Sequence, residues 1–184
     1  ALPPLSPTND GCRTRTQVDT LYEAPYGLDG SGISVMVYDS GVASASHPDF
    51  GGRLHVRDEG ELGNHSTHVA GTIAGSGVNS AANGGTAYQW RGMAPGVTLQ
   101  SYAYGSNDIG VLLYNNPGDL EADYTDAILN HGVDIANNSL GSNIASNGFD
   151  CDITGDYGLT SSLIDAIVRG AIGQPFRSIW AVGN

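Results

Sequence analysis

Short apolar runs alternate with helix-length amphipathic segments along most of this 184-residue chain. The clearest apolar run, 33–38, contains three β-branched residues and stops at Asp39-Ser40-Gly41. A continuous apolar run of this length is typical of a strand that is buried on both faces, as in a parallel sheet. Further strands are predicted at 53–57, 98–103, 133–136 and 178–182.

Three helices are predicted between these strands, at 64–74, from Asp119 or Asp123 to Gly132, and at 163–172. Asn64 is expected to cap the first helix, and Thr160 or Ser161 the third. Gly132 is a suitable residue to end the second. Strands that alternate with helices of about a dozen residues indicate an α/β fold with a doubly wound, mostly parallel sheet and helices on both faces.

Two parts of the chain differ in composition. Residues 1–31 are rich in Pro, Thr, Asp and Gly, and we expect them to form an extended N-terminal arm with one short helical turn near 17–22. Residues 32–184 carry the predicted strands and helices and are expected to belong to a single domain. The segment 178–182 reads as an interior strand, which would leave an open apolar edge if the sheet ended there.

The charge balance disfavours two classes of partner. The chain has 7 Arg, no Lys and 19 Asp and Glu, which gives a net charge of −12. Nucleic acids and anionic membrane surfaces need clustered cations, so neither is expected to bind. No apolar run approaches the roughly 20 residues of a membrane span. Residues 1–15 do not form a signal peptide, so the protein is either cytosolic or has already lost its signal.

The two cysteines, Cys12 and Cys151, lie far apart in the sequence and form no CxxC pair. A zinc or redox site is therefore not indicated. Two interpretations stay open, either two buried thiols or a disulfide that ties the N-terminal arm to the domain and implies an oxidising compartment.

Polar residues that directly follow predicted strands are candidates for a functional site, because α/β sheets bind ligands at the carboxyl ends of their strands. Asp39 follows the first strand, Asn184 follows the last, and His65 lies in the first turn of the helix at 64–74. A carboxylate can orient an imidazole, the imidazole can take a proton from a nucleophile, and an amide can stabilise the resulting oxyanion. These three side chains together predict a site for acyl transfer.

Several motifs in this order closely resemble the subtilisin-like serine protease family. They are 37–42 (VYDSGV), 47–50 (HPDF), 63–75 (GNHSTHVAGTIAG), 92–95 (GMAP), 138–141 (NSLG) and 181–184 (AVGN). The resemblance implies a subtilisin-like fold, with Asp39 as the carboxylate of a catalytic triad, His65 as general base and Asn184 as an oxyanion-hole side chain. It also implies that Ser139, Leu140 and Gly141 line the strand that pairs with the substrate backbone.

The sequence departs from the family at two kinds of position. Ser66 and Ser142 stand where the family usually has glycine. The Gly-Thr-Ser motif of the family's nucleophile is absent, and Ser161 and Ser162 lack its context. We therefore expect the chain to be the N-terminal portion of a catalytic domain that a missing C-terminal segment or second chain completes with the nucleophilic serine.

The function expected from these observations is that of a secreted serine endopeptidase whose signal and propeptide are already removed. It would hydrolyse proteins through an acyl-enzyme and require no cofactor. An inactive, peptide-binding relative is the alternative, and a nucleotide-binding domain is disfavoured because no phosphate loop is complete. The resemblance further suggests a structural calcium ion near Asp49, Asn79 and Asn83.

Overall fold

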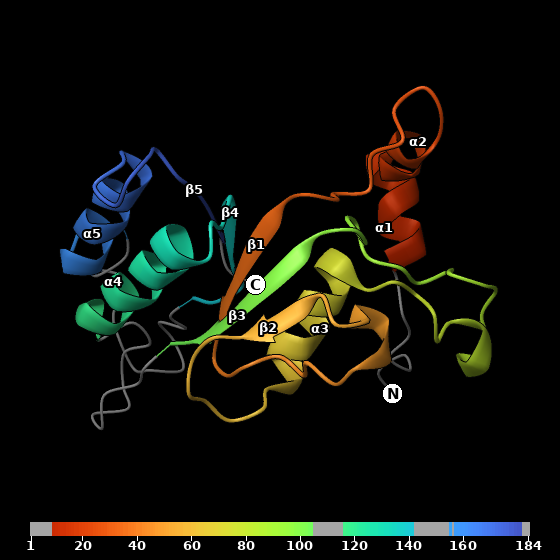
Figure 1. The fold of residues 1–184 in the computed structure, drawn as a ribbon, viewed down its shortest axis with the longest axis horizontal. Helices are drawn as coiled ribbons and strands as arrows, with labels where there is room; N and C mark the ends of the chain where they lie inside the picture. The colour runs from red at the N-terminus through yellow and green to blue at the C-terminus, as the bar shows by residue number, and fades with distance from the viewer. Residues whose placement is uncertain (1–8, 105–115, 142–154, 156, 182–184) are drawn as a thin grey trace.

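The computed structural model describes residues 9–104, 116–141, 155 and 157–181. Their centre is a sheet of five parallel strands in the order β2-β3-β1-β4-β5 (Figure 1). The strands are β1 Ser34–Asp39, β2 Leu54–Val56, β3 Thr98–Ala103, β4 Ile135–Asn138 and β5 Arg177–Trp180. The predicted α/β class and parallel sheet are confirmed, but β5 lies at an edge of the described sheet and not inside it.

The register of the strands aligns their carboxyl ends. Asp39 of β1 lies opposite Ala103 of β3, and Tyr38 lies opposite Asn138 of β4. Asn138 in turn lies opposite Trp180 of β5. The residues that follow these strands therefore emerge at one edge of the sheet, which is where α/β folds place their sites.

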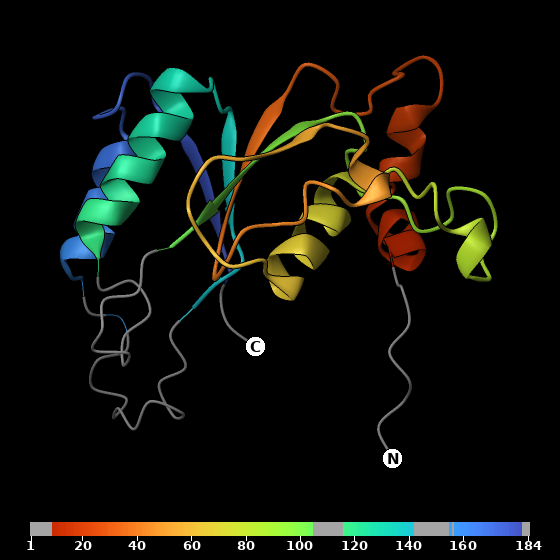
Figure 2. The ribbon, with the colours of Figure 1, turned by 60° about the horizontal axis from the view of Figure 1, so that its bottom comes forward.

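Side chains of β1 alternate between two separate cores. Val35 and Val37 pack on one face with α3, which spans Asn64–Ala74. Met36 and Tyr38 pack on the other face with α4 (Pro117–Thr125) and α5 (Leu159–Val168). Figure 2 shows α3 on one side of the sheet and α4 and α5 on the other. Because β1 is covered on both faces, its sequence is a continuous apolar run.

The caps and ends of the predicted helices differ from the structure at several positions. The second helix begins at Pro117 after an N-cap at Asn116, ahead of the predicted starts at Asp119 and Asp123, and the third ends at Val168, four residues before 172. Gly63, not Asn64, occupies the N-cap of α3. The helix at α4 continues into a π-helical segment, η3 (Asp126–Asn130), before Gly132 turns the chain with a φ of 58°. The helix α5 begins four residues early, after an N-cap at Gly158, so the two expected caps lie inside it. The prediction placed it late because its core-packing residues start only at Leu163.

The N-terminal arm is helical where an extended chain was expected. It forms α1 (Asn9–Thr16) and the short α2 (Val18–Tyr22), the second of which agrees with the predicted turn. The buried Arg13 donates hydrogen bonds from Nη1 to the carbonyls of Gln89 (3.0 Å) and Arg91 (2.7 Å). These contacts span more than 70 residues, so local sequence carries little sign of them. Two 3-10 turns complete the described elements, η1 (Pro48–Phe50) and η2 (Ala81–Asn83).

Candidate active site

Asp39 and His65 form a hydrogen-bonded pair at the carboxyl edge of the sheet. Asp39 is the last residue of β1 and is 1% exposed, and His65 lies in the first turn of α3. Nδ1 of the imidazole lies 2.9 Å from both carboxylate oxygens of Asp39. The contact between these two residues, which the sequence predicted as a functional pair, is present in the structure.

Two main-chain groups fix the position of Asp39. The amide of Ser40 donates to Oδ1 of Asp39 at 2.7 Å, and the Ser40 hydroxyl adds a longer bond of 3.2 Å to the same atom. The amide of Tyr104 donates to the Asp39 carbonyl at 2.9 Å. The carboxylate therefore faces the imidazole with its orientation set by the backbone of the loop that follows β1. Its charge also affects Tyr104: burial, and then the Asp39 carboxylate, raise the pKa of the Tyr104 hydroxyl.

The far side of the His65 ring is open. The side chain is 58% exposed, and within the described part of the chain all its hydrogen bonds go to Asp39. A carboxylate at Nδ1 holds the imidazole proton on that nitrogen and leaves Nε2 as a base. This arrangement can take a proton from a hydroxyl group brought up to Nε2.

The expected substrate-binding residues directly follow β4. Ser139 is half-buried and its Oγ accepts a hydrogen bond of 2.8 Å from Nδ2 of Asn137. Leu140 is buried in the core that α4 and α5 cover, whereas Gly141 is exposed. The backbone after β4 is thus anchored by Leu140 and reaches the surface at Gly141. Asn184 and Ser142 lie outside the described residues.

A polar network beside this segment centres on the buried Asn138, whose partners the motif at 138–141 did not reveal. Asn138, the last residue of β4, accepts a hydrogen bond at Oδ1 from the hydroxyl of Tyr124 (2.8 Å). Its Nδ2 donates to Oγ of Ser178 (3.1 Å) and to the carbonyl of Ile179 (3.0 Å) on β5. The network therefore joins the ends of two strands at the edge of the sheet where Asp39 lies.

The residues suggested for calcium lie in one loop region but bond to each other. The amide of Asn79 donates to Oδ1 of Asp49 at 3.3 Å, and Nδ2 of Asn83 donates to the carbonyl of Asn79 at 2.8 Å. Among the described residues, no group of three or more His, Cys, Asp and Glu side chains could hold a metal ion. Neither observation tests a calcium ion held by one carboxylate with amide and carbonyl oxygens, so calcium at this loop stays a prediction.

Cys12 lies on α1 with an exposed, free thiol, so of the two interpretations the one with two buried thiols is wrong for this residue. Cys151 lies outside the described residues.

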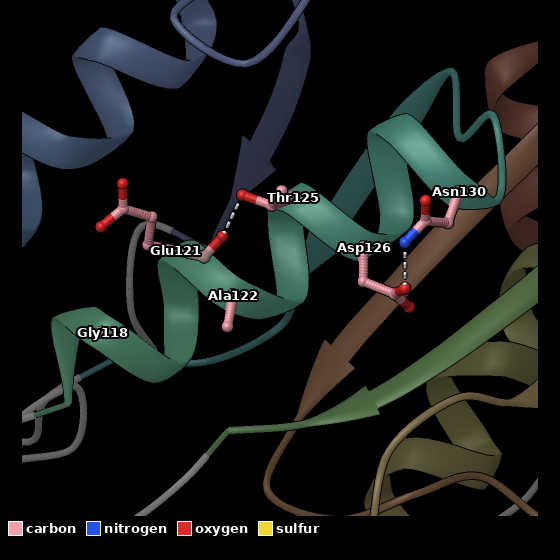
Figure 3. Close-up of a pocket in the computed structure, with 6 residues that line it drawn as sticks. All are labelled: Gly118, Glu121, Ala122, Thr125, Asp126 and Asn130. Atoms are coloured by element: carbon pink, nitrogen blue, oxygen red, sulfur yellow. Dashed lines mark hydrogen bonds between the residues drawn. The ribbon is translucent and has the colours of Figure 1, made fainter.

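One open hollow lies away from the Asp39–His65 pair, along α4 and η3 (Figure 3). Two of its polar side chains bond within the helix: Thr125 donates to the carbonyl of Glu121, and Asn130 donates to Asp126. Asp126 also accepts a hydrogen bond of 2.7 Å from the buried Tyr102. These groups are satisfied without a ligand, so the hollow adds nothing to the site.

The sequence pattern of the subtilase family matches residues 30–184. The chain belongs to the subtilase family. Over 67 residues it is 40% identical to alkaline serine exoprotease A of Vibrio alginolyticus, a stretch that covers 32% of this chain and 12% of the exoprotease.

Solved structures of subtilases show the same fold. The CspB protease of Clostridium perfringens superposes with a TM-score of 0.63 at 20% identity, covering 91% of this chain and 38% of the protease. A cold-adapted subtilisin-like serine proteinase gives 0.51 at 24% identity, covering 88% of this chain and 51% of the proteinase. This subtilase chain thus spans about half or less of the relatives it matches.

Proposed function

We propose that this chain is part of a serine endopeptidase and supplies its Asp–His pair. The observation that carries the proposal is the 2.9 Å contact between Nδ1 of His65 and the buried carboxylate of Asp39, with the other side of the ring open. Membership of the subtilase family supports a serine protease. The chemistry needs no cofactor.

In the proposed mechanism, Nε2 of His65 takes the proton of a serine hydroxyl as that oxygen attacks the carbonyl carbon of the scissile peptide bond. Asp39 holds the imidazole tautomer and stabilises the imidazolium. The tetrahedral intermediate then collapses, and His65 gives the proton to the leaving amine. Water, activated by the same base, hydrolyses the acyl-enzyme and restores the serine.

Asn184 and a backbone N–H are proposed to stabilise the oxyanion of the tetrahedral intermediate. The main chain of Ser139, Leu140 and Gly141 is proposed to pair with the substrate backbone as an added strand. The position of these three residues directly after β4 supports this role, because the aligned register puts the end of β4 beside Asp39.

The nucleophilic serine is proposed to come from a segment beyond these 184 residues, in the same polypeptide or a second one. Within the described part of the chain, no hydroxyl bonds to Nε2 of His65. Ile179 on the edge strand β5 is 54% exposed, which suits a strand that a further segment covers. This chain covers 38% and 51% of the two related structures, so both are considerably longer.

An extracellular location is also proposed. It is supported by the similarity to an exoprotease of Vibrio alginolyticus. None of the described helices is long and apolar enough to cross a membrane.

A serine-reactive fluorophosphonate tests the proposal on the native protein. Labelled protein is digested, and the modified peptide is identified by mass spectrometry. We expect one labelled serine outside the sequence of these 184 residues, and we expect His65→Ala to abolish the labelling. Labelling of a serine within this sequence would contradict the assignment of the nucleophile, and absence of labelling in the native protein would contradict the protease function.

A further inference from the structure

Ser66 lies next to the Asp39–His65 pair and is fully buried. Its hydroxyl donates a hydrogen bond of 2.5 Å to the carbonyl of Gly41. Ser66 directly follows His65 on α3, and Gly41 comes two residues after Asp39. The bond therefore connects the helix that carries the imidazole to the loop that carries the carboxylate.

The carbonyl of Gly41 depends on this hydroxyl. Gly41 is buried, and Ser66 is its described hydrogen-bond donor. A buried carbonyl without a donor is unfavourable, so removal of the hydroxyl would favour a rearranged loop. Main-chain bonds of 2.8–2.9 Å join Val42 to 61–63. Oγ1 of Thr67 on α3 accepts a bond of 3.0 Å from the amide of Ser44, further along the loop, so Ser66 provides the side-chain link to the part of the loop next to Asp39.

Gly63 provides the space that the Ser66 hydroxyl occupies. A side chain at Gly63 would overlap with Oγ of Ser66, and a side chain at Gly41 would come within 2.6 Å of the Glu61 carbonyl. The backbones of 41 and 63 can therefore approach closely enough for the serine to bridge α3 and the loop. A hydroxyl at position 66 thus fits together with glycines at 41 and 63.

We propose that Ser66 is a positioning residue, which sets the orientation of His65 relative to Asp39 through its bond to Gly41. This inference rests on the proposed protease function. The pair must keep its hydrogen bond while the imidazole gains and loses a proton, and an error of about 1 Å in such a site can cost roughly a hundredfold in rate.

The test compares Ser66→Ala with the wild type in the native protein. We expect kcat for peptide hydrolysis to fall about tenfold with KM nearly unchanged, because the chemical step suffers and substrate binding does not. The proton at Nδ1 of His65, identified by its loss in His65→Ala, should also shift in the proton NMR spectrum because its hydrogen bond to Asp39 changes.

Ser80→Ala is the matched control. Ser80 lies in the loop after α3, is 3% exposed, and its Oγ accepts a hydrogen bond of 3.1 Å from the amide of Trp90. This variant loses a buried hydroxyl of the same kind, so it reports the loss of stability alone. We expect it to leave kcat and the Nδ1 resonance unchanged.

Ser66→Cys extends the test if Ser66→Ala does not fold, because a thiol keeps a weaker donor in nearly the same place. Its kcat should be lower than that of the wild type, and its Nδ1 proton resonance should be shifted from the wild-type position. A Ser66 variant that matches the wild type in both readouts overturns the proposal. A shifted Nδ1 resonance in a native protein that hydrolyses no peptide bond would support the positioning role and contradict the proposed function instead.

Discussion

The hydroxyl of Tyr124 donates a hydrogen bond of 2.8 Å to Oδ1 of Asn138, and both residues are at most 1% exposed. Tyr124 lies on α4 and Asn138 ends β4. The same asparagine donates to Ser178 and Ile179 on β5. One buried amide thus joins a helix and two strands directly before the segment proposed to bind substrate.

We predict that Asn138→Ala lowers the free energy of unfolding by about 2–4 kcal/mol, because it removes three hydrogen bonds made by a buried side chain and leaves the Ile179 carbonyl without this donor. Urea denaturation of the native protein measures the change. Asn130→Ala is the control: its exposed side chain bonds to Asp126, and its loss should cost about 0.5 kcal/mol or less. Equal losses in the two variants would show that the network is not a major source of stability.

From the Asp39–His65 contact we predict that a substitution at Asp39 lowers activity while the protein stays folded. Asp39→Asn keeps the shape of the side chain but can stabilise the wrong imidazole tautomer, so kcat should fall by roughly 10³–10⁴. Circular dichroism should show a folded protein. Asp134→Asn is the same change at the opposite end of the sheet, where Asp134 accepts a hydrogen bond from the amide of Ser34. A similar loss of kcat in both variants would contradict a specific role for Asp39.

From the buried carboxyl of Asp123 we predict that the free energy of unfolding depends on pH. Its Oδ2 is buried without a hydrogen-bond partner among the described residues. Burial, followed by the negative charges of Asp119, Asp58 and Asp126, raises its pKa to about 8. In the unfolded chain the same carboxyl loses its proton near pH 4. The folded state therefore binds more protons between these values, and the free energy of unfolding falls as pH rises from about 4 to 8.

Asp123→Asn removes this titration and should flatten the fall in stability across that range. The difference between wild type and variant should grow with pH to roughly 1–3 kcal/mol, a value reduced from the full pKa shift because solvent screens part of the interaction. Urea denaturation at pH 5 and pH 8 measures it. Asp165→Asn on α5 changes an exposed carboxyl and should leave the slope intact. An unchanged slope in Asp123→Asn would mean that this carboxyl is ionised in the folded protein.

Sequence patterns predicted the parts of the fold that depend on local chemistry. The strand at 98–103 is confirmed with the bounds expected, and β1 shifts by one residue. Apolar runs identify such strands because each residue is covered on one face or the other. Asp39 and His65 were predicted for a related reason, since each lies beside the end of a predicted element and within a short recognisable motif.

Contacts between distant segments were not predictable in the same way. The bond from Ser66 to Gly41 links residues 25 positions apart, and the bonds from Asn138 to β5 span about 40. A serine or asparagine in a sequence has many partners available, and tertiary packing selects among them. The helix α1 was missed for the same reason, because its buried residue, Arg13, bonds to a loop that comes much later in the chain.

We predict that Arg13 contributes much of the stability with which the N-terminal arm packs on the domain. Its guanidinium bonds to two carbonyls, those of Gln89 and Arg91, and to the carboxylate of Asp19 at 2.8 Å. Because these are charge-assisted bonds at a buried group, Arg13→Ala should lower the free energy of unfolding by about 2–4 kcal/mol and leave carbonyls without donors. Arg15→Ala, on the same helix but exposed, should change it by about 0.5 kcal/mol or less.

Limited proteolysis gives a second readout, since the Arg13 variant alone should be cut faster within the arm. If both variants are cut at the wild-type rate, the arm is held by other contacts, such as those of the Tyr22 hydroxyl with the carbonyls of Gly92 and Met93.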